Sequence, residues 1–137
     1  MYIEISKSKR KQYIKQIEQF LKNFNNYKVA IINVTEQLDH LHMKANSHTK
    51  RESYEAVIEK LNNELKDNIL IVELIERSLE ELNEIELLFI KYRYSNKWSI
   101  EKTAQNLGYS NKALFTIRNQ IMDKLIISLG SLIHYQE

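Results

Sequence analysis

Apolar side chains recur at helical spacing along most of the chain. In a helix expected over residues 8–24 they lie three, four and three residues apart, at Ile14, Ile17, Leu21 and Phe24. The pair Asn25-Asn26 interrupts this pattern. A second helix is then predicted by Tyr27, Ile31, Val34, Leu38 and Leu41, and the polar residues 44–48 predict a loop.

A third and longer helix is expected to begin at the capping-box spacing Thr49-Lys50-Arg51-Glu52. It carries one seam that alternates between steps of three and four residues: Ile58, Leu61, Leu65, Asn68, Val72, Ile75, Leu79 and Leu82. Such a seam favours a coiled coil or tight helix pairing, in which a single Asn can fix the register. Two interpretations stay open. One is a homo-oligomer formed through Ile58, Leu61, Leu65, Asn68, Val72 and Ile75, and the other is the inner face of a bundle within one chain.

Three further helices are predicted towards the C-terminus, each by a polar N-cap. Asn83 with Glu86 at the third helical position opens a fourth helix that ends near residues 95–96. Ser99 caps a fifth helix, and Ser110 caps a sixth that reaches Leu125 or Leu129. The chain has no Pro and only two Gly, which leaves few sites for tight β-turns. We therefore predict an all-α fold.

The segment 98–125 has the pattern of a helix-turn-helix. Gly108 lies between the fifth and sixth helices, where a left-handed residue is needed and a Cβ would be penalised. Ala104 is small where the two helices must approach each other. The shared core is predicted to contain Leu107, Leu114, Ile117, Ile121 and Leu125.

The opposite face of the sixth helix is predicted to contact DNA bases in the major groove. Its candidates are Asn111, Lys112, Phe115, Thr116 and Asn119. Asn pairs with adenine, Lys donates to guanine or phosphate, and Phe and the Thr methyl contact thymine methyls. Phosphate contacts are expected from Arg93, Lys97, Lys102 and Ser110. Arg118 lies nearer the buried side, where we expect it to reach a phosphate or an acidic neighbour.

The segment L-N-E-I-E-L-L-F-I-K-Y-R-Y, followed by W-S-I-E-K-T-A-Q-N-L-G-Y-S, resembles the fourth region of bacterial sigma factors. The positions that match are Arg93, Tyr94, Ala104, Leu107, Gly108 and Ser110. The whole helix layout is similar to phage late-operon transcriptional regulators of the ArpU and RinA type. That resemblance implies a small sigma-like activator working with the host RNA polymerase. Residues 111–116 lack the charged set of sigma factors, which favours a different, A·T-rich target.

Charge is segregated along the chain. Residues 1–51 carry ten Lys and Arg against four Asp and Glu, residues 52–86 carry three against eleven, and residues 87–137 carry seven against three. The acidic middle is expected to face away from DNA, because phosphates repel it. The basic start, with Lys7, Lys9, Arg10, Lys11 and Lys15, either binds phosphate or is a solvated helix face.

Other chemistry is not expected. His40, His42 and His48 invite a zinc interpretation, but residues two apart on a helix point to different faces and there is no Cys. The glutamates of residues 73–86 are expected on a solvated helix face rather than in a catalytic cleft. We therefore expect no enzyme, no catalytic residue and no metal or other cofactor. No apolar run is long enough to span a membrane and no signal peptide is expected, so we expect the cytoplasm of a bacterial host.

These patterns predict a helical N-terminal region at 1–81 and a DNA-binding domain at 82–130. The leading hypothesis is a sequence-specific transcriptional regulator, namely a late-gene activator, that binds double-stranded DNA and RNA polymerase. One alternative is the DNA-recognition subunit of a phage terminase, for which a ring of many subunits is the discriminating observation. Another is a helical adaptor that docks a protein without DNA.

Overall fold

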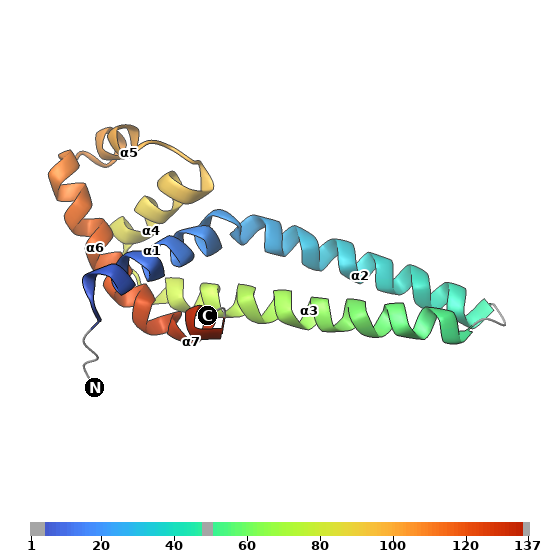
Figure 1. The fold of residues 1–137 in the computed structure, drawn as a ribbon. Helices are drawn as coiled ribbons and strands as arrows, with labels where there is room; N and C mark the ends of the chain where they lie inside the picture. The colour runs from blue at the N-terminus through green and yellow to red at the C-terminus, as the bar shows by residue number, and fades with distance from the viewer. Residues whose placement is uncertain (1–4, 48–50, 136–137) are drawn as a thin grey trace. The chain divides into compact units, whose positions relative to one another are not determined.

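The computed structural model describes residues 5–47 and 51–135, and within them every regular element is helical (Figure 1). The elements are α1 (Lys7–Lys22), α2 (Phe24–Ser47), α3 (Arg51–Glu80), α4 (Glu84–Ile90), the π-helical turn η1 (Lys91–Ser95), α5 (Ile100–Leu107), α6 (Asn111–Ser128) and α7 (Gly130–Tyr135). The predicted all-α fold is therefore confirmed. Within those residues, no helix combines the length and apolar character needed to cross a bilayer.

Several predicted helix ends are wrong. The break after the first helix lies at Asn23, whose N–H bonds to the carbonyls of Gln19 and Leu21, so Asn25 and Asn26 lie inside α2. Residues 44–47, predicted as loop, continue α2 because polar side chains do not prevent helical hydrogen bonds at an exposed helix end. His48 and the predicted cap Thr49-Lys50 lie outside the described residues. The chain also adds α7 after Leu129, which the sequence analysis did not predict.

The chain divides into two compact units. The first contains residues 1–23 and 74–137, and the second contains residues 24–73. This division differs from the predicted boundaries at 1–81 and 82–130, because α1 packs against η1, α6 and α7. The N-terminal helix therefore belongs to the same unit as the C-terminal helices.

The second unit consists of α2 and most of α3. Val34, Leu38 and Ala45 of α2 and Val72 of α3 are buried. The earlier seam residues of α3 are half-buried: Ile58, Leu61, Leu65 and Asn68. This partial burial of the seam side chains within one chain favours the intramolecular interpretation of the seam.

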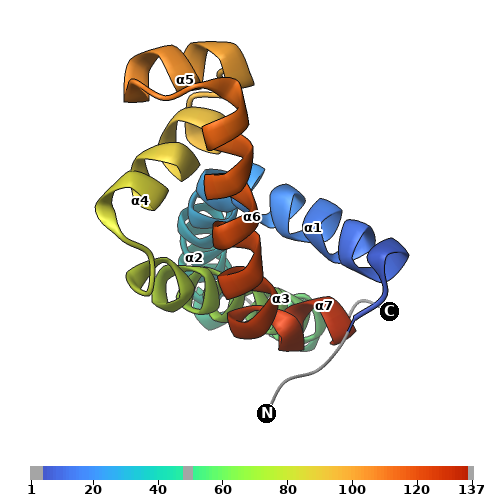
Figure 2. The same cartoon turned by 90° about the vertical axis from the view of Figure 1, so that its left-hand side faces the viewer.

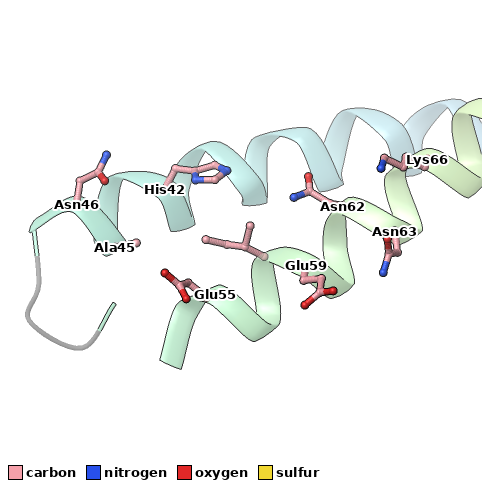
Figure 3. A pocket seen from close by; sticks show the side chains of 9 residues that line it. His42, Ala45, Asn46, Glu55, Glu59, Asn62, Asn63 and Lys66 are labelled. Carbon is pink, nitrogen blue, oxygen red and sulfur yellow. The ribbon is translucent and has the colours of Figure 1, made fainter. Parts of the chain in front are cut away.

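Near the far end of this unit, α2 and α3 leave a polar groove of about 410 Å³ (Figure 3). It is lined by His42, Ala45 and Asn46 of α2 and by Glu55, Ile58, Glu59, Asn62, Asn63 and Lys66 of α3. His40 lines a different hollow, with Asn33, Glu36 and Gln37. The two histidines therefore point to different faces. Within the described residues, no group of three His, Asp or Glu side chains is arranged to hold a metal.

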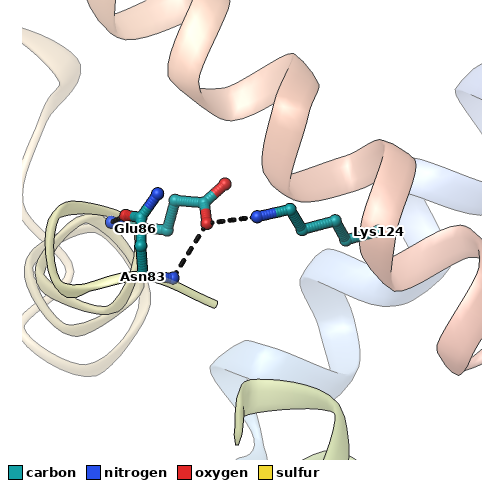
Figure 4. Close-up of polar contacts among 3 residues, drawn as sticks. All are labelled: Asn83, Glu86 and Lys124. Atoms are coloured by element: carbon teal, nitrogen blue, oxygen red, sulfur yellow. Dashed lines mark hydrogen bonds and ion pairs between the residues drawn. The ribbon is translucent and has the colours of Figure 1, made fainter. Parts of the chain in front are cut away.

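In the first unit, a buried carboxylate connects α4 to α6 (Figure 4). The predicted capping box is confirmed: the Asn83 side chain accepts from the Glu86 N–H, and Glu86 Oε1 accepts from the Asn83 N–H at 3.0 Å. The same oxygen pairs with Lys124 Nζ of α6 at 2.7 Å, and the Glu86 side chain is only 3% exposed. A charge at this depth is costly unless it is paired, so Lys124 fixes where α4 meets α6.

We predict that Glu86→Gln lowers the free energy of unfolding by about 2 kcal/mol, because it removes a charge-assisted hydrogen bond from a buried site. Glu84→Gln is the matched control, since Glu84 is exposed in the first turn of the same helix. Its expected cost is about 0.5 kcal/mol. Urea unfolding followed by circular dichroism measures both, and equal losses would contradict a structural role for the buried pair.

Candidate nucleic-acid interface

Helices α5 and α6 are joined by a tight turn whose three predicted signals are all present. Ser99 Oγ accepts from the Lys102 N–H at 3.1 Å and caps α5. Gly108 ends α5 in the left-handed region, with φ 76°. Ser110 Oγ accepts from the Ala113 N–H at 3.1 Å and caps α6. Ser99 thus starts α5, whereas Gly108 and Ser110 stop α5 and start α6 within a few residues, so α5 and α6 are held close together.

The inner face of this helix pair is packed. Ala104 is buried at the approach of α5 to α6, as predicted. Leu114, Ile121 and Leu125 of α6 are fully buried. Leu107 and Ile117, also predicted for the core, are half-buried. Most residues of the predicted inner face of α6 therefore pack against other helices, and the opposite side of α6 is exposed to solvent.

The five predicted base-contacting residues all lie on that other side. Asn111, Lys112, Phe115, Thr116 and Asn119 are exposed, and Phe115 retains 51% of its surface. Phe115 adds an apolar ring to an otherwise polar set of side chains. All five therefore lie on the N-terminal half of α6, the helix labelled α6 in Figure 2.

The four predicted phosphate-contacting residues differ in their surroundings. Lys97 is exposed and has φ 58°, a backbone conformation uncommon for a residue other than Gly. Lys102 is exposed on α5, with its ammonium 4.4 Å from the centre of the Trp98 ring. Ser110 is exposed while its hydroxyl caps α6. Lys97 and Lys102 therefore lie at the start of α5, and Ser110 lies at the start of α6.

Arg93 is oriented differently. It lies in η1, is half-buried, and donates from its guanidinium to the Trp98 carbonyl at 2.8 Å. Its Nε is buried and has no hydrogen-bond partner among the described residues. Tyr92, in the same turn, stacks on Trp98 with 4.6 Å between ring centres. Arg93 therefore orders the loop between η1 and α5.

Helix α1 makes contacts to this region that the sequence does not indicate. Glu18 of α1 accepts from the hydroxyl of buried Tyr94 at 2.8 Å and from Arg118 of α6 at 3.1 Å. Arg10 of α1 pairs with Asp123 of α6 at 2.6 Å. An acidic neighbour for Arg118 was one of the two predictions for that residue. The partner itself lies 100 residues away in sequence, where no local pattern indicates it.

The Tyr94 hydroxyl is held neutral by its surroundings. Burial raises its pKa above the ordinary value of 10.0, and the negative charge of Glu18 and the hydrogen bond to it raise it further. The phenol is thus a hydrogen-bond donor throughout the range in which most proteins are stable.

Comparison of the chain with protein-family models, with curated proteins and with solved structures finds no match.

We predict that Gly108→Ala lowers the free energy of unfolding by about 1 kcal/mol, because a Cβ is strained at this φ. No neighbouring atom lies within 4 Å of the added Cβ, so the cost comes from the backbone alone. Gly108→Asn is expected to cost less, since Asn tolerates the left-handed region. Gly130→Ala is the control: it has open space and no positive φ, and it is expected not to destabilise the protein. Equal losses at both glycines would contradict this account.

A second prediction concerns pH. Tyr94→Phe is expected to lower the free energy of unfolding by about 1 kcal/mol near neutral pH, through loss of the bond to Glu18. In the folded state the Tyr94 pKa is raised, so its stabilisation is present below the unfolded value of 10.0 and is lost as pH rises above it. Wild type should therefore be more stable than Tyr94→Phe near neutral pH. This difference in the free energy of unfolding should shrink and then reverse sign as the pH rises above 10.0.

Urea unfolding of both proteins at neutral and alkaline pH measures this difference. Tyr109→Phe is the matched control, because Tyr109 is 40% exposed and loses the same hydroxyl. Its difference from wild type should stay small throughout. If the difference in free energy of unfolding between wild type and Tyr94→Phe does not change with pH, the raised pKa of the Tyr94 hydroxyl is contradicted.

Proposed function

We propose that this protein is a sequence-specific DNA-binding transcriptional regulator, with α5 and α6 forming a helix-turn-helix. The observation that carries the proposal is the exposed N-terminal half of α6, where Asn111, Lys112, Phe115, Thr116 and Asn119 share one side while the opposite side is buried. In helix-turn-helix proteins the N-terminal residues of the second helix contact base edges, and the first helix crosses the backbone.

In this arrangement α6 enters the major groove. Asn111 and Asn119 offer the paired donor and acceptor that recognise adenine, and Phe115 and the Thr116 methyl contact thymine methyls. Lys112 donates to guanine or to phosphate. A surface of two amides and apolar groups with a single cation favours an A·T-rich site.

The surrounding cations position the duplex. Lys97 and Lys102, both at the start of α5, bind phosphates, and the backbone N–H groups after Ser110 meet a phosphate at the start of α6. Arg93 is assigned a different role from the one expected from sequence. It holds the Trp98 carbonyl, and thereby the loop that carries Lys97.

The resemblance of residues 82–110 to sigma factors supports a regulator that works with RNA polymerase. Together with the likeness to late-operon regulators, it favours a phage-encoded activator in the cytoplasm of a bacterial host. The exposed acidic side chains of α3, among them Glu59, Glu64 and Asp67, offer a protein-binding surface that does not compete for DNA.

We predict that Lys112→Glu with Thr116→Glu lowers DNA affinity at least about tenfold, because it places two carboxylates against the duplex. Binding is measured by gel shift on duplexes selected from a random library by the wild-type protein. The selected sites should be A·T-rich, and the affinity should fall as salt rises.

The matched control is Asn62→Glu with Lys66→Glu. It makes the same change of charge at the same spacing on exposed positions of α3. The control should bind DNA like wild type, and circular dichroism should show that both variants are folded. Failure of the wild-type protein to bind any duplex in a salt-sensitive manner would overturn the proposed function.

A further inference from the structure

Helix α1 carries a regular series of charged residues, of which only Glu18 takes part in the packing of the fold. Lys7, Lys11, Lys15, Glu18 and Lys22 follow one another at steps of four, four, three and four residues, so they lie along one side of the helix. The four lysines are exposed, whereas Tyr13, Ile14, Ile17, Phe20 and Leu21 form the buried side. We call these four lysines the α1 lysine stripe.

The acidic member of this series shows which way the stripe faces. Glu18 reaches Arg118 of α6 at 3.1 Å and the hydroxyl of Tyr94 at 2.8 Å. The side of α1 that holds the lysines is therefore the side that borders the middle of α6. Arg10, which lies between Lys7 and Lys11 in sequence, reaches Asp123, and Asp123 follows Asn119 of the proposed base-contacting set by one helical turn. Figure 2 shows α1 running beside α6 within this unit.

The acidic groups on this part of the surface are neutralised. Asp123 lies on the outward side of α6, one turn after Asn119, and Arg10 pairs with it at 2.6 Å. Glu18 is paired with Arg118. The carboxylates that would repel a phosphate backbone are thus matched by arginines, and the net charge of the surface comes from the lysines.

The start of α1 is basic where helix stability favours acid. Its first turn contains Lys7 and Lys9 and no acidic residue. Cations are unfavourable at the positive end of the helix dipole, so these lysines do not serve the stability of α1. The stripe also contains no aromatic or Arg side chain of the kind that anchors protein interfaces. Flexible point charges of this type suit a phosphate backbone.

We propose that α1 is a second DNA-binding element, whose lysine stripe contacts the phosphate backbone beside the groove that α6 enters. This inference rests on the proposed function and extends it, because it makes the DNA-binding surface continuous from α6 onto the N-terminal helix. The contacts are to phosphate and carry no sequence preference, so their signature is the salt dependence of binding.

The test compares Lys11→Gln with Lys15→Gln against the matched control Lys60→Gln with Lys66→Gln, which removes two exposed lysines from α3. Each protein is titrated onto a labelled mixed-sequence duplex of roughly three helical turns, at a series of salt concentrations. Each phosphate contact contributes about 0.9 to the slope of log affinity against log salt. The α1 variant should therefore lose about 2 from that slope, and the α3 control should keep the wild-type value.

The outcomes separate the two proposals. Absence of salt-sensitive binding by the wild-type protein overturns the proposed function and this inference with it. Wild-type binding with an unchanged slope in the Lys11/Lys15 variant overturns this inference and leaves the function in place. An equal loss of slope in the α3 control also overturns it, because the effect is then one of net charge. Thermal unfolding of all three proteins should agree, since the substituted side chains are exposed.

Discussion

The packing of α1 against the C-terminal helices is the contact on which the first unit depends. Its centre is Glu18, which accepts from buried Tyr94 and from Arg118. Tyr94 and Arg118 lie 76 and 100 residues from Glu18 in sequence. Their hydrogen bonds to Glu18 specify how α1 meets η1 and α6, because a polar group left without a partner in a poorly hydrated site is costly. Apolar burial around it, including Ile17 and Phe89 with no exposed surface, supplies the attraction.

The contact between α1 and the C-terminal helices also orders η1 and the loop that precedes α5. The π-helical turn η1 presents Tyr94 inward to Glu18, Arg93 to the Trp98 carbonyl and Tyr92 to the Trp98 ring. Such turns are uncommon in helices and often accompany functional sites, because the extra residue reorients the side chains on either side. Here the side chains of Tyr92, Arg93 and Tyr94 contact Trp98 and α1, and the loop that contains Trp98 leads into α5.

A buried charge on α4 also fixes the position of α6. Glu86 completes its own helix cap and pairs with Lys124. Helix α6 is therefore held by ion pairs at Arg118 and Lys124 and by apolar side chains between them, while its outward face stays exposed. That division explains how a helix can carry polar and apolar groups on its solvent side and still be firmly placed.

Much of the local structure could be predicted from the sequence alone. The caps Asn83, Ser99 and Ser110 and the left-handed Gly108 were identified correctly, because each acts through backbone groups a few residues away. The exposed set on α6 also followed from helical periodicity. The sequence did not indicate η1 or the continuation of α2 through residues 25–26 and 44–47, because the tertiary context and helix cooperativity outweigh weak local preferences.

What only the tertiary structure decided is which distant residues share a surface. Arg93 and Arg118 both looked available for phosphate, and the structure commits them to the Trp98 carbonyl and to Glu18. The basic start of the chain had two equal interpretations, and its packing beside α6 distinguishes paired Arg10 from the exposed lysines. Sequence periodicity fixes which side of a helix is buried, since that depends on the helix itself. The partner that covers it depends on contacts between remote segments, which no local pattern encodes.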